Sequence, residues 1–251
     1  MILQARDRRF LRELAKLRIV DRQQAQLIAG FRSKSRANVR LLLLVRAGLL
    51  KRLSIGTVAG GRKGLYCLTT AGAASAGVPS SNAPQRKSDS LLIIDPFIEH
   101  QLALNSVILQ LQHSDLPAGV VFKQWLTFSR PISQRVPLIP DAYIELGTSD
   151  GPKCLFLEVD RGTESSRVWE KKTDAYLGFA VSGEFQNVFA QSQFRVLVIV
   201  PSERRLQSLR RVVLRKTEKV FWFRSFNSIN SEGFWSPQWS RPPGDQRIPL
   251  L

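Results

Sequence analysis

The chain has few of the residues that build disulfide frameworks and zinc sites. Its 251 residues include only two cysteines and two histidines. Cys67 and Cys154 lie far apart, which predicts neither a disulfide nor a zinc site and is typical of a reducing compartment. No run of about 18 apolar residues occurs, so we expect no membrane span. The charged start MILQARDRRF does not resemble a signal peptide, and we expect a cytoplasmic protein.

Acidic residues are also scarce, and least common near the N-terminus. The chain has 37 Lys+Arg against 20 Asp+Glu, a net charge of +17. Residues 1–77 hold 16 basic and 3 acidic residues, whereas residues 78–251 hold 21 and 17. Such an excess of positive charge attracts phosphate and supplies the salt-dependent part of nucleic-acid affinity. The N-terminal third is therefore the expected nucleic-acid-binding part.

The first 77 residues predict helices followed by a hairpin. The apolar stripe of the first helix, over 6–18, is Phe10, Leu11, Leu14 and Leu17. Asp21 is the expected N-cap of a second helix that ends near Gly30, and Ser33 or Ser35 caps a third over 35–47. Two strands then flank Gly60-Gly61, and Thr69 opens another short helix. Three helices and a hairpin indicate a winged helix, a variant of the helix-turn-helix.

The third helix and the hairpin supply the candidate DNA contacts. A recognition helix presents its polar N-terminal half to the major groove, and the apolar half, Leu41 to Val45, is expected to pack inward. Arginine can hydrogen-bond specifically to guanine, and asparagine to adenine, but both side chains also contact phosphate. No cofactor is required for such binding. The candidates are Arg32, Lys34, Ser35, Arg36, Asn38 and Arg40, together with Arg62 and Lys63 at the expected wing tip.

A second domain is expected after a linker. Residues 78–90 are rich in Pro and Ser and predict a linker. Residues 91–226 predict a helix at 95–113, three strands, a helix at 164–181, and then strand, helix and strand. This order indicates a mixed sheet flanked by helices. The tail, 227–251, shows no periodicity. The fold class is α+β, with a winged helix joined to an α/β domain that carries a mixed sheet.

Acidic residues of the second domain are expected to converge on neighbouring strands. Alternation places Asp141 beside Tyr143 and Glu145 on one face, and Glu158 with Asp160 on one face of the next strand. Lys172 is expected on the sheet-facing side of the following helix, near these carboxylates. Either a salt-bridge cluster or a catalytic site explains this arrangement. In the second case Asp141 and Glu158 are the metal ligands, for Mg²⁺ or Mn²⁺.

The order of elements and the motif Pro140-Asp141 followed by Glu158-x-Asp160 resemble the PD-(D/E)xK nuclease core. The sequence departs from that pattern because Asp160 stands where the motif has lysine. Some members of the superfamily carry the lysine on the next helix, and Lys172 is placed to take that role. Other members have lost activity and keep the fold for binding. The catalytic set implied by the resemblance is Asp141, Glu158, Asp160 and Lys172.

The chain as a whole resembles the replication-relaxation family of plasmids and other mobile elements. The resemblance runs from about residue 6 to 210. It implies a role in plasmid replication, copy control or DNA relaxation. It rests on Ala47-Gly48-Leu49-Leu50, Leu68-Thr69-x-Ala71-Gly72, Glu99-His100-x-Leu102-Ala103-x-Asn105, Pro140-Asp141-Ala142, residues 157–164 from Leu157 to Glu164, and Lys172-x-x-x-Tyr176.

Three functions remain open from the sequence. The first is a DNA-binding replication or transcription accessory protein, or regulator, with an inactive nuclease-like domain. The second is a metal-dependent DNA nuclease or nickase directed by the winged helix. The third is a protein-interaction adaptor, against which the concentrated charge of residues 1–77 argues. Double-stranded DNA is the expected partner, no membrane is expected, and the sequence does not decide whether the chain forms a homodimer.

Overall fold

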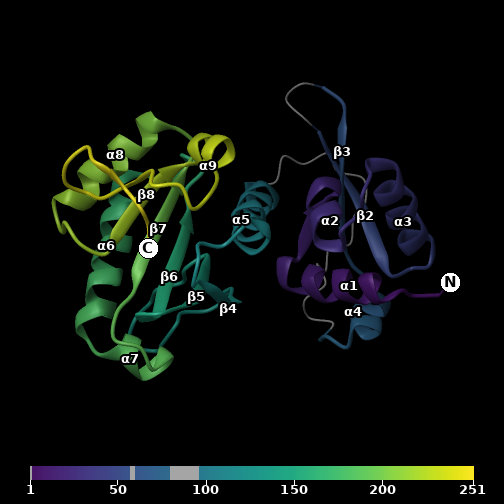
Figure 1. Cartoon of the computed structure of the whole chain (residues 1–251), viewed down its shortest axis with the longest axis horizontal. Coiled ribbons are helices and arrows are strands. Elements are labelled where there is room, and N and C mark those ends of the chain that lie inside the picture. Colours follow the sequence, from purple (N-terminus) through teal and green to yellow (C-terminus); the bar gives the residue numbers. More distant parts are fainter. Residues whose placement is uncertain (1, 57–59, 80–95) are drawn as a thin grey trace. The chain divides into compact units, whose positions relative to one another are not determined.

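The structure, a computed structural model, describes residues 2–56, 60–79 and 96–251 and divides the chain into two compact units. The first unit is Met1–His113 and the second is Ser114–Leu251. Both contain helices and a sheet, which confirms the α+β class (Figure 1). Most of the expected linker, 78–90, lies outside the described residues.

The first unit packs helices around a three-stranded sheet with the order β1-β3-β2. Its elements are α1 (Ala5–Leu17), β1 (Ile19–Asp21), α2 (Arg22–Ala29), α3 (Lys34–Arg46), β2 (Leu50–Gly56), β3 (Arg62–Leu68), α4 (Thr70–Ala76) and α5 (Pro96–His113).

Local signals set these boundaries. Asp21 accepts the Gln24 N–H at 2.8 Å and caps α2, as expected. Ser33, rather than Ser35, caps α3. Gly72 is required in α4 because a Cβ there would lie 2.0 Å from the Leu49 carbonyl oxygen. The short strand β1 was not expected, and it pairs antiparallel with β3, Val20 opposite Tyr66.

Helix α5 belongs to the first unit, whereas the sequence placed it in the second domain. Leu102 packs with Ile19 and Leu65 of the small sheet. The buried Asn105 donates hydrogen bonds to the carbonyls of Leu17, at 3.1 Å, and Ile19, at 2.6 Å. The buried amide of Asn105 is therefore satisfied by backbone carbonyls of α1 and β1, a contact that the sequence pattern does not reveal.

The second unit contains a seven-stranded mixed sheet with the order β10-β9-β8-β7-β6-β5-β4. Strands β6, β7 and β8 run parallel and the other neighbours antiparallel. The elements are β4 (Val121–Leu126), β5 (Ala142–Thr148), β6 (Gly151–Val159), α6 (Ser166–Val181), α7 (Glu184–Phe189), β7 (Arg195–Val200), α8 (Glu203–Leu214), β8 (Phe221–Ser225), α9 (Phe226–Glu232), β9 (Trp239–Ser240) and β10 (Arg247–Ile248).

Helices α6 and α8 lie on the same side of this sheet (Figure 1). The alternating side chains Tyr143, Phe156 and Val198 pack there with Tyr176 and Leu209. The expectation of an irregular tail over 227–251 was wrong in part, because β9 and β10 extend the sheet. The buried Arg224 donates hydrogen bonds to tail carbonyls, one of them that of Phe234 at 2.9 Å. The tail thus completes the second unit.

Candidate nucleic-acid interface and nuclease-like site

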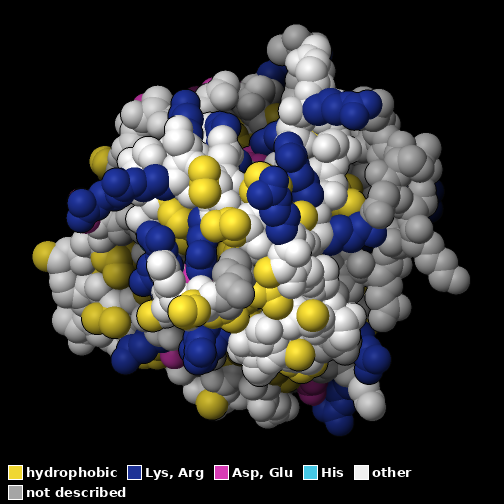
Figure 2. Space-filling model, turned by 90° about the vertical axis from the view of Figure 1, so that its right-hand side faces the viewer, with side chains coloured by type: hydrophobic (Ala, Val, Ile, Leu, Met, Phe, Trp, Pro, Cys, Tyr) yellow, Lys and Arg dark blue, Asp and Glu magenta, His cyan; other side chains and the backbone are white. Residues whose placement is uncertain are grey.

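The N-terminal half of α3 is open to solvent. Ala37, Leu41 and Leu44 are buried and fix the helix against the first unit. Lys34, Ser35, Arg36 and Asn38 of α3 are exposed, as is Arg32 just before the helix. One face of the molecule shows many Lys and Arg side chains and few acidic ones (Figure 2). These five candidates therefore keep the exposure that contact with DNA requires, and their role stays a prediction.

Arg40, also a candidate, has a partner inside the first unit. Its guanidinium forms a bidentate ion pair with the buried Asp7 of α1, with Nε 2.9 Å from Oδ1, and also donates to the Ile2 carbonyl at 3.0 Å. Burial raises the pKa of Asp7, but Arg40 and the Gln4 N–H outweigh it, so that the pKa lies below its usual value. Arg40 thus stabilises the packing of α3 on α1.

A hollow of about 610 Å³ lies between α3 and the hairpin. Arg22, Arg52 and Arg62 line it, together with Asn38 of α3. A Cβ at Gly64 would lie 3.2 Å from Arg52 Nε, so the glycine leaves room for this guanidinium beside β3. The hollow is therefore cationic and joins the helix to the hairpin.

The acidic residue of the lining is neutralised within the first unit. Asp21 Oδ2 lies 2.5 Å from Lys63 Nζ, so the capping residue of α2 is also an ion-pair partner of β3. Lys63 and Arg62 lie on β3, opposite Ile55 and Gly56. Of the five residues between these strands, 57–59 lie outside the described residues. Arg62 is exposed, whereas Lys63 has a structural partner.

The apolar half of α3 does not pack inward as a block. Val39 is 60% exposed, Leu42 41% and Leu43 38%. Only Leu41 and Leu44 of this stretch are buried, because a helix turns by about 100° per residue and consecutive leucines cannot share one face. Leu42 lines the hollow beside the arginines. Apolar contact is available there for a thymine methyl group or for another apolar ligand.

In the second unit, Glu158 is the centre of a buried charged cluster. The residue is 1% exposed near the carboxyl end of β6. Its Oε1 accepts the Tyr176 hydroxyl at 2.6 Å and its Oε2 the Lys172 ammonium at 2.9 Å. Lys172 also lies 2.8 Å from Glu164. The expectation that Lys172 faces the sheet is confirmed, and both Glu158 oxygens are engaged.

Asp141 lies at the same end of the sheet as Glu158. It directly precedes β5, and its Oδ2 accepts the Val159 N–H at 2.7 Å from the neighbouring strand. Burial raises the pKa of Glu158, Lys172 lowers it, and the charge of Asp141 raises it further, with a net upward shift. Burial lowers the pKa of Lys172, yet Glu158 and Glu164 raise it more.

Asp160 is held by a residue that the sequence did not single out. It follows β6, and its carboxylate forms a bidentate pair with Arg205 of α8, with Nε 2.6 Å and Nη2 3.0 Å from its oxygens. The Gly162 N–H donates to the same carboxylate at 3.0 Å. Asp160 is therefore paired with Arg205 of α8 and not with Lys172. Asp160 and Arg205 are 45 positions apart in the sequence, so no local signal indicates this pairing.

These carboxylates do not fit a divalent metal centre as they stand. Magnesium needs several oxygen ligands in near-octahedral geometry. Glu158 already accepts a hydroxyl and an ammonium, and Asp160 accepts a guanidinium. Across the ranges that the structure describes, no group of three or more His, Cys, Asp or Glu residues is placed to hold a metal ion. The observed contacts instead satisfy each buried charge with a protein partner.

Comparison with known proteins identifies one family. The model of the replication-relaxation family matches residues 11–191. That range includes α3, the hairpin, Asp141, Glu158 and Lys172. No curated protein and no solved structure matches the chain. Among the described helices, none is both long and apolar enough to cross a membrane.

Proposed function

The chain belongs to the replication-relaxation family, and from this premise we propose that its first unit binds duplex DNA as a winged helix. The chain then acts as an accessory protein or regulator in the replication or transcription of a plasmid or other mobile element. This role would place it in the cytoplasm. DNA binding requires no cofactor.

The topology of the first unit supports this proposal. Elements α1 to β3 follow one another as helix, strand, two helices and two strands, and β1 adds to the hairpin. In a helix-turn-helix the second helix of the pair α2–α3 enters the major groove. Arg36 and Asn38 are exposed near the N-terminus of α3, where base-reading residues lie in such proteins.

The cationic hollow beside α3 is the observation that carries the proposal. Arg52 and Arg62 extend the positive surface from the helix to the hairpin, and the acid of the lining is already paired with Lys63. A duplex whose base edges contact α3 brings its phosphate backbone over the neighbouring hairpin. The two arginines are then phosphate contacts, which supply affinity without reading sequence.

We propose that the second unit has a nuclease-like fold used for structure or further contact, without catalysis. The order β4-β5-β6-α6-α7-β7, which adds the short helix α7 before β7, and the mixed sheet support the resemblance to the PD-(D/E)xK core. Glu158 and Asp160 are already engaged by Lys172, Tyr176 and Arg205, which supports a structural role for these carboxylates. A metal-dependent nuclease is the second candidate, favoured by the single fact that Lys172 reaches Glu158 from the helix.

A binding measurement with matched charge changes tests the proposal. The variant Arg52→Gln/Arg62→Gln should bind duplex DNA at least about tenfold more weakly and lower the slope of log K against log salt by about 2, because two phosphate contacts are lost. The control Arg8→Gln/Arg12→Gln removes two exposed arginines of α1. Equal losses in both variants would show that only net charge matters, and the proposed interface would be wrong.

A further inference from the structure

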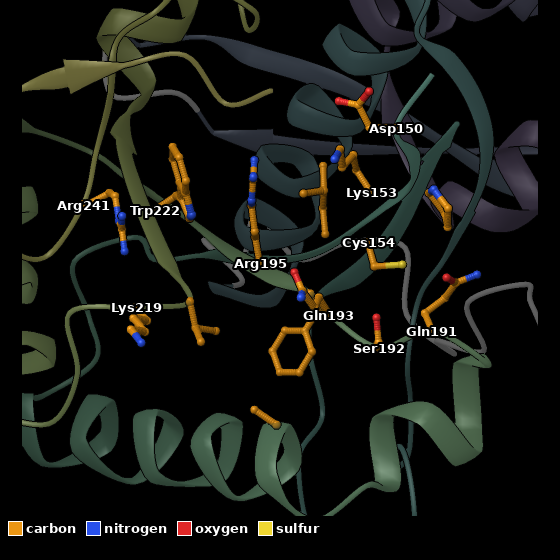
Figure 3. A pocket seen from close by; sticks show the side chains of 15 residues that line it. Asp150, Lys153, Cys154, Gln191, Ser192, Gln193, Arg195, Lys219, Trp222 and Arg241 are labelled. Carbon is orange, nitrogen blue, oxygen red and sulfur yellow. The ribbon is translucent and has the colours of Figure 1, made fainter. Parts of the chain in front are cut away.

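A second cationic hollow, of about 700 Å³, lies within the second unit (Figure 3). It is at the amino ends of the parallel strands, where Lys153 lies early in β6, Arg195 begins β7 and Trp222 lies early in β8. Glu158 lies near the opposite, carboxyl end of β6. This hollow is therefore separate from the nuclease-like site, and its volume is in the range of small-molecule sites.

The lining carries an excess of positive charge. Lys153, Arg195, Lys219 and Arg241 face one acid, Asp150. Burial lowers the pKa of Arg195, and the nearby charge of Arg241 lowers it further. Within the described parts of the chain, no carboxylate lies at ion-pair distance from any of the four cations. Like charges brought together in a partly buried hollow are stabilised by an anion.

Trp222 holds the two arginines in place. Its ring centroid is 4.8 Å from the guanidinium carbon of Arg195 and 5.8 Å from that of Arg241. Figure 3 shows Trp222 between these two side chains. Arg195 also donates to the Leu250 carbonyl, and Arg241 Nη2 donates to the Glu218 carbonyl at 2.9 Å. The guanidinium planes are thus oriented before any ligand binds, which reduces the entropy lost on binding.

Donors remain for such a ligand. Each guanidinium has five N–H groups, and the hydrogen bonds to the Leu250 and Glu218 carbonyls engage only some of them. Arg241 Nε is buried and has no hydrogen-bond partner among the described residues. A guanidinium with free neighbouring N–H groups binds phosphate or carboxylate in a bidentate manner. The pair Arg195–Arg241 is therefore suited to a tetrahedral anion with several oxygens.

The backbone at this hollow is strained. Val220, which lines it, has a φ of 73°, a conformation that β-branched residues rarely adopt. Its carbonyl accepts the Val196 N–H at 2.8 Å, which fixes the start of β8 against β7. Strained residues of this kind persist where the surrounding structure holds them, and they are concentrated at ligand sites. Val220 lies between Lys219 and the start of β8, so the strain positions a lining cation.

We propose that this hollow binds the phosphate group of a nucleotide, either as a free nucleotide or within a single strand of nucleic acid. Arg195, Arg241, Lys153 and Lys219 neutralise the phosphate. The amide side chains of Gln191 and Gln193 in the same lining match the donors and acceptors of a base edge. These amides favour a nucleotide over an inorganic anion. The proposal is independent of duplex binding by the first unit.

Calorimetric titration of the full chain with three probes tests this site. The probes are ATP, a 5′-phosphorylated single-stranded decathymidylate, and inorganic phosphate. In the part of the chain that the structure describes, the side chains of Lys153 and Lys219 form no hydrogen bond or ion pair, so the variant Lys153→Gln/Lys219→Gln is expected to fold. We expect it to bind at least one of the two nucleotide probes at least about tenfold more weakly. The control Arg167→Gln/Arg204→Gln removes two exposed cations of the same unit and should bind normally.

Each result decides the proposal. A loss confined to ATP assigns the site to free nucleotides, and a loss confined to the oligonucleotide assigns it to a strand. The variant Arg241→Gln should show the same loss as the lysine pair. Inorganic phosphate that binds as tightly as ATP would overturn the nucleotide assignment. Unchanged affinity for both nucleotide probes in Lys153→Gln/Lys219→Gln would overturn the site itself.

Discussion

Arg40 of α3 and Asp7 of α1 form a bidentate ion pair in which the carboxylate is 1% exposed. The pair joins the helix proposed to contact DNA to the helix that supports it. Since a buried carboxylate without a partner is unstable, the geometry of α3 depends on this contact.

Replacing Arg40 by alanine should therefore destabilise the first unit by about 3 kcal/mol. The double variant Arg40→Ala/Asp7→Asn should recover part of this loss of stability, because asparagine carries no buried charge that lacks a partner. Urea unfolding monitored by circular dichroism at pH 7 measures both changes. A difference below about 0.5 kcal/mol for Arg40→Ala would contradict the structural role of the pair, since this is the range of exposed substitutions.

The same pair predicts an acid-dependent loss of stability. The pKa of Asp7 in the folded chain is below its ordinary value of 3.8, so folding favours the ionised form. Its contribution is complete above the unfolded pKa and is lost as the pH falls through the folded pKa. Unfolding between pH 7 and pH 2 should show this loss in the wild type. Asp7→Asn should show a smaller loss over the same range.

Substitutions at candidate base contacts and at a candidate phosphate contact should have different effects on DNA binding. Arg36→Ala or Asn38→Ala should reduce the discrimination between a target site and random duplex by about 1–3 kcal/mol if the side chain contacts a base edge. Arg62→Ala should weaken both duplexes to a similar extent. Competition binding with a selected target duplex and a random duplex measures the affinity of each variant for both. If selection from random duplexes yields no preferred site, the regulatory part of the proposed function is wrong.

The position of α5 predicts which fragment folds. Residues 1–113 retain Leu102 and Asn105, which pack on and bond to the first unit, whereas residues 1–77 do not. The fragment 1–113 should unfold cooperatively and keep most of the salt-dependent duplex affinity. The fragment 1–77 exposes Ile19 and Leu65 and should melt at a lower temperature. Equal melting temperatures for the two fragments would show that α5 is dispensable.

Glu158→Ala decides between a binding fold and a nuclease. In the binding fold the change removes one of the two carboxylates that pair with the half-buried Lys172 and also removes the acceptor of the Tyr176 hydroxyl. We therefore expect a loss of several kcal/mol of stability and no cleavage by wild type or variant. Thermal unfolding and plasmid nicking with magnesium or manganese measure the two properties. Lys171→Ala, on the exposed side of α6, is the control for stability. Wild-type nicking that disappears in Glu158→Ala would support the nuclease instead.

Local sequence signals were sufficient for most elements. Caps at Asp21 and Thr69 mark helix starts, because their side chains accept backbone N–H groups within three residues. Alternation along β5 places Tyr143 and Glu145 on one face, and the Tyr143 hydroxyl donates to the Glu145 carboxylate at 3.2 Å. Such periodic patterns depend only on neighbouring residues, so the sequence reveals them.

Contacts between distant residues could not be predicted in the same way. Arg40 and Lys63 were candidate DNA contacts in the sequence, which gave no sign that Asp7 and Asp21 pair with them in the folded unit. Strand β1 has three residues and exists because β3 pairs with it. The hollow at Trp222 combines residues from β6, β7, β8 and the tail, and only the sheet order brings them together.

In the second unit, the cationic hollow and the buried cluster around Glu158 lie at opposite ends of the parallel strands. Lys153 and Glu158 are five residues apart on β6, which corresponds to roughly 16 Å along the strand. Free-energy changes at sites so far apart, without common partners, are expected to add. The variant Lys153→Gln/Glu158→Gln should therefore change the free energy of unfolding by the sum of the changes in the two single variants, within about 0.5 kcal/mol. Substitutions at the Lys153 end of this sheet can then accumulate during evolution without altering the stability that the Glu158 end contributes.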